Sequence, residues 1–325
     1  MTTILDIQIA KEFLNKNNIS DPQISKVAGD ASFRSYYRVI SQNLSYILMY
    51  APVKLENTAP FIQVDEILLS YNLRAPKIIA RDTSMGLLLL EDFGDISFTK
   101  FLKENPQKEF EIYSKACDKI ITIHQKSNLN NSLEIKKYNH AILINEVFLF
   151  IDWYLKLNNQ TISPEQKMFF KNEFFNLFDK LNKTNQVLVH RDYHADNLMI
   201  ISKDNKFEDI GIIDFQDALI GSYAYDLLSL LEDARRDVDQ SNQQKLFDYF
   251  IKSSNYDYHQ FMIDYEVISL QRNIKILGIF ARLALRDNKK QYLDYLPRVK
   301  NFVLQRIDKT SIISNYFKGF LKNYL

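Results

Sequence analysis

Residues 190–197 and Asp214 have the side chains that transfer of a phosphoryl group requires. The segment 190–197 reads His-Arg-Asp-Tyr-His-Ala-Asp-Asn between two apolar runs, and Asp214 ends a third apolar run. Phosphoryl transfer needs a carboxylate near the attacking hydroxyl and oxygen ligands that hold Mg²⁺ against the phosphates. Asp192 and Asn197 share one tight loop, and antiparallel strands would place Asp214 beside Asn197. One carboxylate and one amide oxygen suffice, because Mg²⁺ keeps waters and substrate phosphates as its other ligands.

The histidines of this segment also permit two other interpretations. His190 and His194 have the spacing of two zinc ligands on a helix, but that motif needs glutamate where Arg191 stands. The segment could instead be a solvated loop, although loops between buried strands often carry function. The spacing H-x-D-x-x-x-x-N, followed by I-D-F, favours phosphoryl transfer, since it matches the catalytic and metal loops of kinase-like folds.

The elements that would position these residues change in kind once along the chain. Up to about Asp92 the sequence predicts short strands around one helix, and long helices dominate beyond it. The expected early elements are strands at 33–39, 46–50, 77–81 and 87–90 and a helix at 58–71. The expected later elements are helices at 110–125, 141–156 and 164–182 and strands at 187–189, 198–201 and 210–213. The fold class is therefore α+β, with a small β-rich part at 1–91, a hinge at about 91–95 and a larger helical part at 92–325.

The composition limits the nucleotide-binding devices and the partners of the chain. Its seven glycines include no pair with Walker A spacing and no G-x-G, so neither that loop nor a dinucleotide fingerprint is present. A net charge of +1 gives no reason to expect binding to nucleic acid or to a membrane. The single cysteine and the absence of a signal-peptide pattern lead us to expect a cytoplasmic protein. No feature of the sequence leads us to expect an obligatory protein partner.

Four stretches of the chain resemble one known family. They are 29–39 (GDASFRSYYRV), 87–95 (LLLLEDFGD), 188–199 (LVHRDYHADNLM) and 212–238 (IIDFQDALIGSYAYDLLSLLEDARRDV). The chain is similar to the aminoglycoside phosphotransferase-type small-molecule kinases, which share the two-lobed protein-kinase-like fold. Within them it most resembles the bacterial anomeric amino-sugar kinases, which phosphorylate the C1 hydroxyl of N-acetylmuramate and N-acetylglucosamine for cell-wall recycling. The resemblance implies ATP, Mg²⁺ and a sugar substrate, with a nucleotide-binding lobe at 1–91 and a catalytic and substrate-binding lobe at 92–325.

The resemblance also implies roles for individual residues in catalysis, in metal binding and in ATP binding. Asp192 would be the catalytic base, and Asn197 and Asp214 would be the Mg²⁺ ligands. The segment 29–35 would cover the phosphates, because a glycine allows close approach and hydroxyls and amides donate to phosphate oxygens. The phosphate contacts would come from Gly29, Ser32 and Ser35, and the hinge would offer backbone groups to adenine from Glu91, Asp92 and Phe93.

One departure from the family pattern concerns the phosphate-binding lysine. Kinase-like folds usually carry this lysine on the strand that follows the phosphate loop, but here Met49 stands where it is expected. Because methionine cannot bind phosphate, another cation must act. Arg34 is our first candidate, since a guanidinium pairs bidentately with phosphate, and Lys54 is the second. Glu66 on the first helix then loses its usual partner and becomes a solvated residue.

Residues that follow the metal loop are candidates for binding the substrate. Asp217 would either orient the substrate or stabilise a helix N-terminus. Asp226 lies in a buried helical pattern and would brace the catalytic loop from beneath. Arg235 and Arg236 follow on the same predicted helix, and either could meet the lactyl carboxylate of a muramic acid or remain solvated.

Three functions remain open on the sequence. The first is an ATP-dependent kinase that acts on C1 of an amino sugar. The second is a kinase for another small alcohol, such as an aminoglycoside or choline, although an aminoglycoside pocket needs a dense acidic lining. The third is a pseudokinase that binds ATP without turnover. The missing lysine favours the third function, whereas the intact Asp192, Asn197 and Asp214 oppose it.

Overall fold

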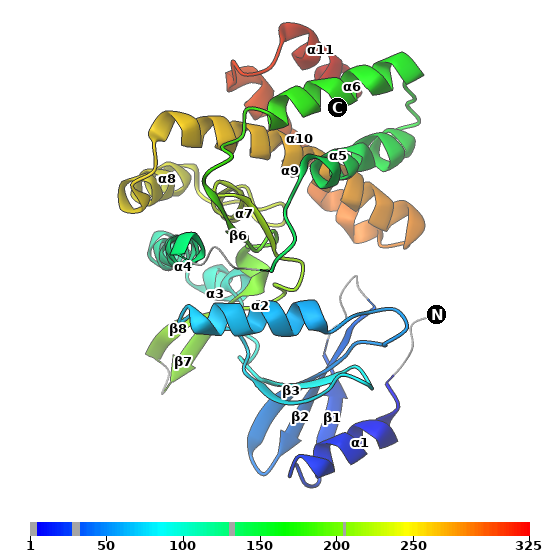
Figure 1. Cartoon of the computed structure of the whole chain (residues 1–325), viewed down its shortest axis with the longest axis vertical. Coiled ribbons are helices and arrows are strands. Elements are labelled where there is room, and N and C mark those ends of the chain that lie inside the picture. The colour runs from blue at the N-terminus through cyan, green and yellow to red at the C-terminus, as the bar shows by residue number, and fades with distance from the viewer. Residues whose placement is uncertain (1–4, 28–32, 130–133, 204–205) are drawn as a thin grey trace. The chain divides into compact units, whose positions relative to one another are not determined.

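The computed structural model describes residues 5–27, 33–129, 134–203 and 206–325, and the chain divides into two compact units (Figure 1). Unit 1 comprises residues 1–104 and 196–217, and unit 2 comprises residues 105–195 and 218–325. The chain thus returns to unit 1 for one short segment after the first part of unit 2, so the units do not follow a single division at 91–95. The functional division at that point stays a prediction.

Unit 1 is built on a five-stranded antiparallel sheet with the order β1-β2-β3-β5-β4. The strands are β1 (Gln23–Lys26), β2 (Ser35–Ser41), β3 (Leu44–Tyr50), β4 (Ile78–Asp82) and β5 (Leu87–Glu91). The strands predicted at 33–39 and 46–50 are confirmed as β2 and β3. They pair as a hairpin on either side of Gln42 and Asn43, whose φ angles of 50° and 64° suit a tight two-residue turn. The sequence did not predict β1, whose four residues are mostly exposed.

The helices of unit 1 are α1 (Ile7–Lys16), α2 (Ala59–Ser70) and α3 (Phe98–Glu104). The prediction of one helix before Asp92 is wrong, because α1 precedes the sheet. The side chain of Asp6 caps α1 by accepting a hydrogen bond from the backbone N–H of Gln8 at 2.8 Å. Phe13 and Leu14 of α1 are buried in one core with sheet residues that include Leu48 and Leu89. The predicted helix at 58–71 is α2.

The returning segment adds a hairpin to unit 1. It consists of β7 (Leu198–Lys203) and β8 (Lys206–Ile212), which pair antiparallel. The backbone N–H of Ile200 donates to the carbonyl of Ile96 at 2.8 Å, and that of Ile212 donates to the carbonyl of Arg74 at 2.8 Å. These bonds tie both hairpin strands to the first part of the chain.

Unit 2 is mainly helical and is organised around the 29-residue helix α9. Its helices are α4 (Glu109–Leu129), α5 (His140–Leu149), α6 (Pro164–Phe178), α7 (Tyr225–Leu231), α8 (Gln240–Ser254), α9 (Tyr258–Arg286), α10 (Leu296–Lys309) and α11 (Asn315–Tyr324). The two strands among its described residues, β6 (Gln186–Val189) and β9 (Leu219–Ser222), pair antiparallel, and the sequence predicted β6 but not β9. Among the described helices of both units, none is long and apolar enough to cross a membrane.

One predicted helix of unit 2 changes its form partway along. The helix expected at 141–156 is α-helical to Leu149 and continues as a π-helical turn, Phe150–Leu155. Gly278 of α9 lies against this junction, where a Cβ atom on Gly278 would come within 2.2 Å of the carbonyl carbon of Leu149. The close packing of α9 against α5 therefore requires glycine at this position.

Candidate active site

The loop that begins at His190 is held by a buried carboxylate of α7. The backbone N–H groups of His190 and Arg191 donate to the two oxygens of Asp226 at 2.8 and 3.0 Å. Burial raises the pKa of Asp226 to about 7, although these two hydrogen bonds act in the opposite direction. Arg191 has a φ of 75°, a conformation that needs support from its surroundings. The expectation that Asp226 braces the loop is therefore confirmed.

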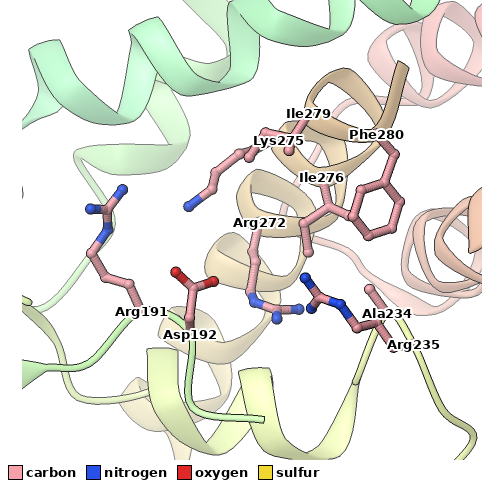
Figure 2. Close-up of a pocket in the computed structure, with 9 residues that line it drawn as sticks. All are labelled: Arg191, Asp192, Ala234, Arg235, Arg272, Lys275, Ile276, Ile279 and Phe280. Carbon is pink, nitrogen blue, oxygen red and sulfur yellow. The ribbon is translucent and has the colours of Figure 1, made fainter. Parts of the chain in front are cut away.

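Asp192 lines a small cavity of unit 2, which Figure 2 shows. The charged residues of this lining are the carboxylate of Asp192 and four cations, Arg191, Arg235, Arg272 and Lys275. Burial alone would raise the pKa of Asp192, but nearby cations, Lys275 first among them, lower it to about 2. Asp192 is thus a carboxylate at physiological pH, and it can accept a hydrogen bond from a hydroxyl group.

Glu146 of α5 holds two of the four cations in place. Its Oε1 lies 2.5 Å from Nη2 of Arg191 and 3.4 Å from Nζ of Lys275. Its Oε2 accepts hydrogen bonds from Nε2 of Gln271, at 2.8 Å, and from the hydroxyl of Tyr138. Lys275 also donates to the hydroxyl of Tyr225 at 3.0 Å, and its ammonium points toward Asp192 in Figure 2. Glu146 therefore balances two positive charges and fixes their positions.

Lys275→Met is expected to make activity more sensitive to acid. The folded pKa of Asp192 lies below its ordinary value, so the carboxylate form persists as the pH falls until that low pKa is reached. Removing Lys275 removes the largest of the effects that lower this pKa, so the acid limb of kcat/KM should move to higher pH. Lys275→Arg, which keeps the charge, should leave the limb near its wild-type position. An unchanged acid limb in Lys275→Met would show that Lys275 does not act on Asp192.

The two residues predicted to hold Mg²⁺ lie together in unit 1. β7 begins directly after Asn197, and Leu198 pairs with Ile212 near the end of β8. Nδ2 of Asn197 lies 3.5 Å from Oδ2 of Asp214, and Nε2 of Gln216 donates to Oδ1 of Asp214 at 2.8 Å. The prediction that an antiparallel arrangement places Asp214 beside Asn197 is confirmed.

The donor set at this position fits Mg²⁺. A carboxylate and an amide supply the hard oxygen atoms that Mg²⁺ prefers, and the ion takes only one or two carboxylates from a protein. In residues 5–27, 33–129, 134–203 and 206–325, no group of three or more His, Cys, Asp or Glu side chains could hold a metal ion.

The two histidines of the loop contact other residues of unit 2. Nδ1 of His190 accepts a hydrogen bond from the backbone N–H of Asp192 at 3.3 Å, and His194 contacts Arg235, so both histidines support the loop.

The acid that α2 buries is Asp65, not Glu66. Asp65 is 1% exposed, and no hydrogen-bond partner for its Oδ1 is found among the described residues. Burial first, and then Glu66 and Glu91, raise the pKa of Asp65 to about 7. Glu66 is exposed and lies 3.5 Å from Arg81, as expected for a solvated residue. Sequence reasoning missed Asp65, because two adjacent acids on a helix do not reveal which one faces inward.

Residues on the predicted phosphate-binding side lie in unit 1. Met49 is fully buried and pairs with Leu88 of β5, so this strand position belongs to the core. Arg34 directs Nη2 to within 4.0 Å of Oδ2 of Asp217, which brings together two residues predicted for different roles. Ser35 is buried at the start of β2. Gly29 and Ser32 lie outside the described residues.

The side chains of the predicted hinge are engaged within unit 1. Glu91 accepts a hydrogen bond from Arg74 at 2.6 Å, and its backbone N–H donates to the carbonyl of Lys77 at 2.9 Å. Asp92 accepts from Nε of Arg38 at 2.7 Å, and Ser45 and the N–H of Gly94 donate to it as well. Phe93 packs against Gly211, where a Cβ atom would lie 2.5 Å from the ring. The amide of Glu91 is thus already used, which leaves the backbone of Asp92 and Phe93 for the predicted contact with adenine.

The structure separates the two arginines that follow Asp226. The prediction that both lie on the same helix as Asp226 is wrong, because α7 ends at Leu231. Arg236 turns away from the cavity, and its Nη2 lies 2.9 Å from Glu109 while its Nη1 donates to Tyr113 at 2.9 Å. Arg235 lines the cavity beside Asp192. Of the two arginines predicted to bind substrate, only Arg235 lines this cavity.

Prediction from the sequence also missed the residues of α9 that line the cavity. Arg272 and Lys275 line the cavity, and Gln271 reaches Glu146. The signal was present, since these polar residues interrupt a helix that is otherwise largely buried and apolar. A buried charge usually has a partner or a function, so the pattern Gln-Arg-Asn-Ile-Lys at 271–275 should have been identified as a candidate site.

Comparisons with known proteins identify the family of the chain. A family model described as the phosphotransferase enzyme family matches residues 23–261, which is more than half of the chain. The N-acetylmuramate/N-acetylglucosamine kinase of Pseudomonas putida is 30% identical over 319 residues, covering 95% of this chain and 91% of that protein. The kinase of the same name from Pseudomonas aeruginosa is 31% identical over 293 residues, covering 85% and 81%.

The fold is shared with solved kinase structures. A choline kinase from Streptococcus pneumoniae superposes with a TM-score of 0.64 at 14% identity, covering 92% of this chain and 99% of that chain. This similarity confirms the predicted protein-kinase-like fold. The family match and the two relatives establish the enzyme class. The chain belongs to the phosphotransferase enzyme family and is a small-molecule kinase.

Proposed function

We propose that this kinase uses ATP and Mg²⁺ to phosphorylate the C1 hydroxyl of N-acetylmuramate or N-acetylglucosamine, as a step of cell-wall recycling in the cytoplasm. Relatives that are 30% and 31% identical carry these two sugars in their names. The structural observation that supports the proposal most directly is Asp192, an ionised carboxylate in a cavity whose other charged residues are cations. Such a cavity suits a neutral or anionic acceptor better than a cationic one.

Asp192 acts on the acceptor hydroxyl in this proposal. Its carboxylate accepts a hydrogen bond from the hydroxyl and orients the oxygen for attack on phosphorus. Because Asp192 is ionised, its carboxylate can orient the hydroxyl and accept its proton as the bond between oxygen and phosphorus forms. Asp226 and Glu146 keep Asp192 in place, the first through the backbone of the loop and the second through Arg191 and Lys275.

Other residues serve the nucleotide in this proposal. Asn197 and Asp214 would hold Mg²⁺, which neutralises charge on the phosphates when it is bound. Residues 1–91 form the nucleotide-binding part, and the returning segment 196–217 adds the metal ligands to the same compact unit. We assign phosphate binding to Gly29, Ser32, Arg34 and Ser35, and adenine binding to the backbone of Asp92 and Phe93.

An ADP-release assay with four acceptors tests the proposed function. N-acetylmuramate and N-acetylglucosamine should both stimulate ADP release in the presence of Mg²⁺. Kanamycin and choline should not, because each is a cation and the cavity beside Asp192 already holds four cations. Stimulation by kanamycin or choline alone would replace the proposal with a different small-alcohol kinase. ATP binding without ADP release from any acceptor would favour the pseudokinase.

A further inference from the structure

We propose that Phe93 is a positioning residue whose ring sets the place of the metal ligand at the end of β8. The inference rests on the function proposed above, in which the backbone of Asp92 and Phe93 serves adenine and Asp214 holds Mg²⁺. It adds that the hinge segment 91–95 also orients the metal site, through the side chain that it directs at β8. Both segments belong to unit 1.

The ring of Phe93 occupies the space beside Gly211 of β8. A Cβ atom on Gly211 would come within 2.5 Å of Cδ2 and 2.6 Å of Cε2 of that ring. A larger residue at this position therefore requires that the ring or the strand move. The next residue, Ile212, pairs with Leu198 at the base of the hairpin. The close contact thus lies three positions before Asp214, on the strand that leads to it.

Arg74 binds the same end of β8 and the hinge at once. Its backbone carbonyl accepts a hydrogen bond from the N–H of Ile212 at 2.8 Å, and Arg74 forms a parallel bridge with Gly211. Its Nη2 donates to Oε1 of Glu91 at 2.6 Å, and its guanidinium carbon lies 5.7 Å from the centre of the Phe93 ring. The backbone of Arg74 thus holds the strand, while its side chain contacts the hinge.

The backbone on both sides of Phe93 is fixed through the side chain of Asp92. Oδ2 of Asp92 accepts hydrogen bonds from Nε of Arg38 at 2.7 Å and from the hydroxyl of Ser45 at 2.6 Å. Its Oδ1 accepts from the N–H of Gly94 at 2.8 Å. Because the hinge backbone is held in this way, the Phe93 ring projects from a fixed point, and β8 packs against it there.

The chain between the ring contact and the metal ligand is tied at each residue. The N–H of Ile212 donates to Arg74, and the N–H of Ile213 donates to the carbonyl of Asn197 at 3.1 Å. A shift of β8 at Gly211 is therefore passed on to Asp214, because closely packed segments transmit displacements. Groups that orient metal ligands typically change metal affinity about 10- to 100-fold when they are altered.

The test uses Gly211→Ala, with Gly319→Ala as its matched control. Gly319 lies in α11, where an added Cβ atom meets no atom of the described residues within 4 Å. Calorimetry gives the dissociation constant of ADP in EDTA and in Mg²⁺, and we call the ratio of the first to the second the metal gain. Gly211→Ala should lower the metal gain at least about tenfold and change the constant in EDTA less than about threefold. Gly319→Ala should leave both at their wild-type values.

Phe93→Leu in the Gly211→Ala background shows whether the ring causes the loss. Leucine is smaller than phenylalanine and leaves room for the added methyl group, so the double variant should regain most of the metal gain. Phe93→Leu alone should lose part of it, because β8 then packs against a smaller side chain. The two changes are thus expected to be strongly non-additive, as for residues in contact.

Arg74→Met and Arg81→Met form a second matched pair in unit 1. Arg81 also pairs with a glutamate, Glu66, at 3.5 Å, but both of these side chains are exposed. Arg74→Met should lower the metal gain at least about threefold, less than Gly211→Ala does, because the backbone bond to Ile212 remains. Arg81→Met should keep the wild-type metal gain, since an exposed ion pair contributes little.

The outcomes separate this inference from the proposed function. A wild-type metal gain in Gly211→Ala, a loss that Phe93→Leu does not reduce, or equal metal gains in Arg74→Met and Arg81→Met would overturn the positioning role. If Gly211→Ala does not fold, the arginine pair decides. A wild-type affinity for ADP that Mg²⁺ does not raise would overturn the metal assignment as well. The expected metal gains without phosphorylation of either sugar would overturn the proposed function alone.

Discussion

Asp192→Asn is expected to lower kcat for sugar phosphorylation about 10²- to 10⁴-fold, the usual contribution of a positioned acid–base group. Asparagine keeps the shape of the side chain but cannot take the hydroxyl proton. The substitution also removes the negative charge that Lys275 and Arg191 face, so the net charge of the cavity becomes more positive. The ADP-release assay measures the loss, and the dissociation constant for ATP should change by less than about threefold, because the substitution is made on the acceptor side.

A matched control separates the loss of catalysis from a loss of folding. Asp294→Asn makes the same chemical change at an exposed acid in the 3₁₀-helical segment Lys290–Tyr295. It should keep wild-type turnover. If Asp192→Asn keeps more than about a tenth of wild-type activity, Asp192 is not the base, since that loss lies below the range for such groups.

Asp214→Asn is expected to lower turnover about 100-fold or more and to raise the Mg²⁺ concentration needed for half-maximal activity at least about tenfold. The substitution preserves the shape of the side chain beside Asn197 and Gln216 but removes the carboxylate charge. Asp214 has a φ of 63°, which asparagine tolerates as well as aspartate does, so the backbone should keep its course. The fold should therefore survive while the affinity for the metal falls.

The measurement is a Mg²⁺ titration of ADP release at saturating ATP and sugar, with the thermal unfolding temperature recorded in parallel. The unfolding temperature should remain within a few degrees of wild type. An unchanged Mg²⁺ requirement would remove Asp214 from the metal site. Restoration of full activity by added Mg²⁺ would show that Asp214 affects metal affinity alone.

The parts of the site that the sequence predicted lie close together in the chain. Asp192 and Asn197 share one loop, and Asp214 follows after a single hairpin, so spacing and strand pairing were enough to place the metal pair. The brace from Asp226 could be predicted because an acid inside an apolar helix needs donors, and the loop supplies two. These predictions succeeded because the residues lie close together in the sequence and because the apolar periodicity of the helix is simple to recognise.

The parts that the sequence did not predict depend on contacts between distant segments. Glu146 meets Lys275 across 129 positions, a pairing that no local pattern encodes. The choice between Arg235 and Arg236 depends on where α7 ends, and propensity predicts element boundaries poorly. The complete burial of Met49, which pairs with Leu88, depends on the packing of the sheet and not on the sequence around it. Tertiary packing decided each of these outcomes.

Phosphorus NMR of the reaction product tests the central claim most directly. The protein is incubated with ATP, Mg²⁺ and N-acetylmuramate, and the product is examined for coupling between phosphorus and the sugar protons. We predict one new phosphate ester signal that is coupled to the anomeric proton, formed by wild-type enzyme and Asp294→Asn but not by Asp192→Asn. A signal coupled to the C6 protons, or the same product from Asp192→Asn at a comparable rate, would contradict the account.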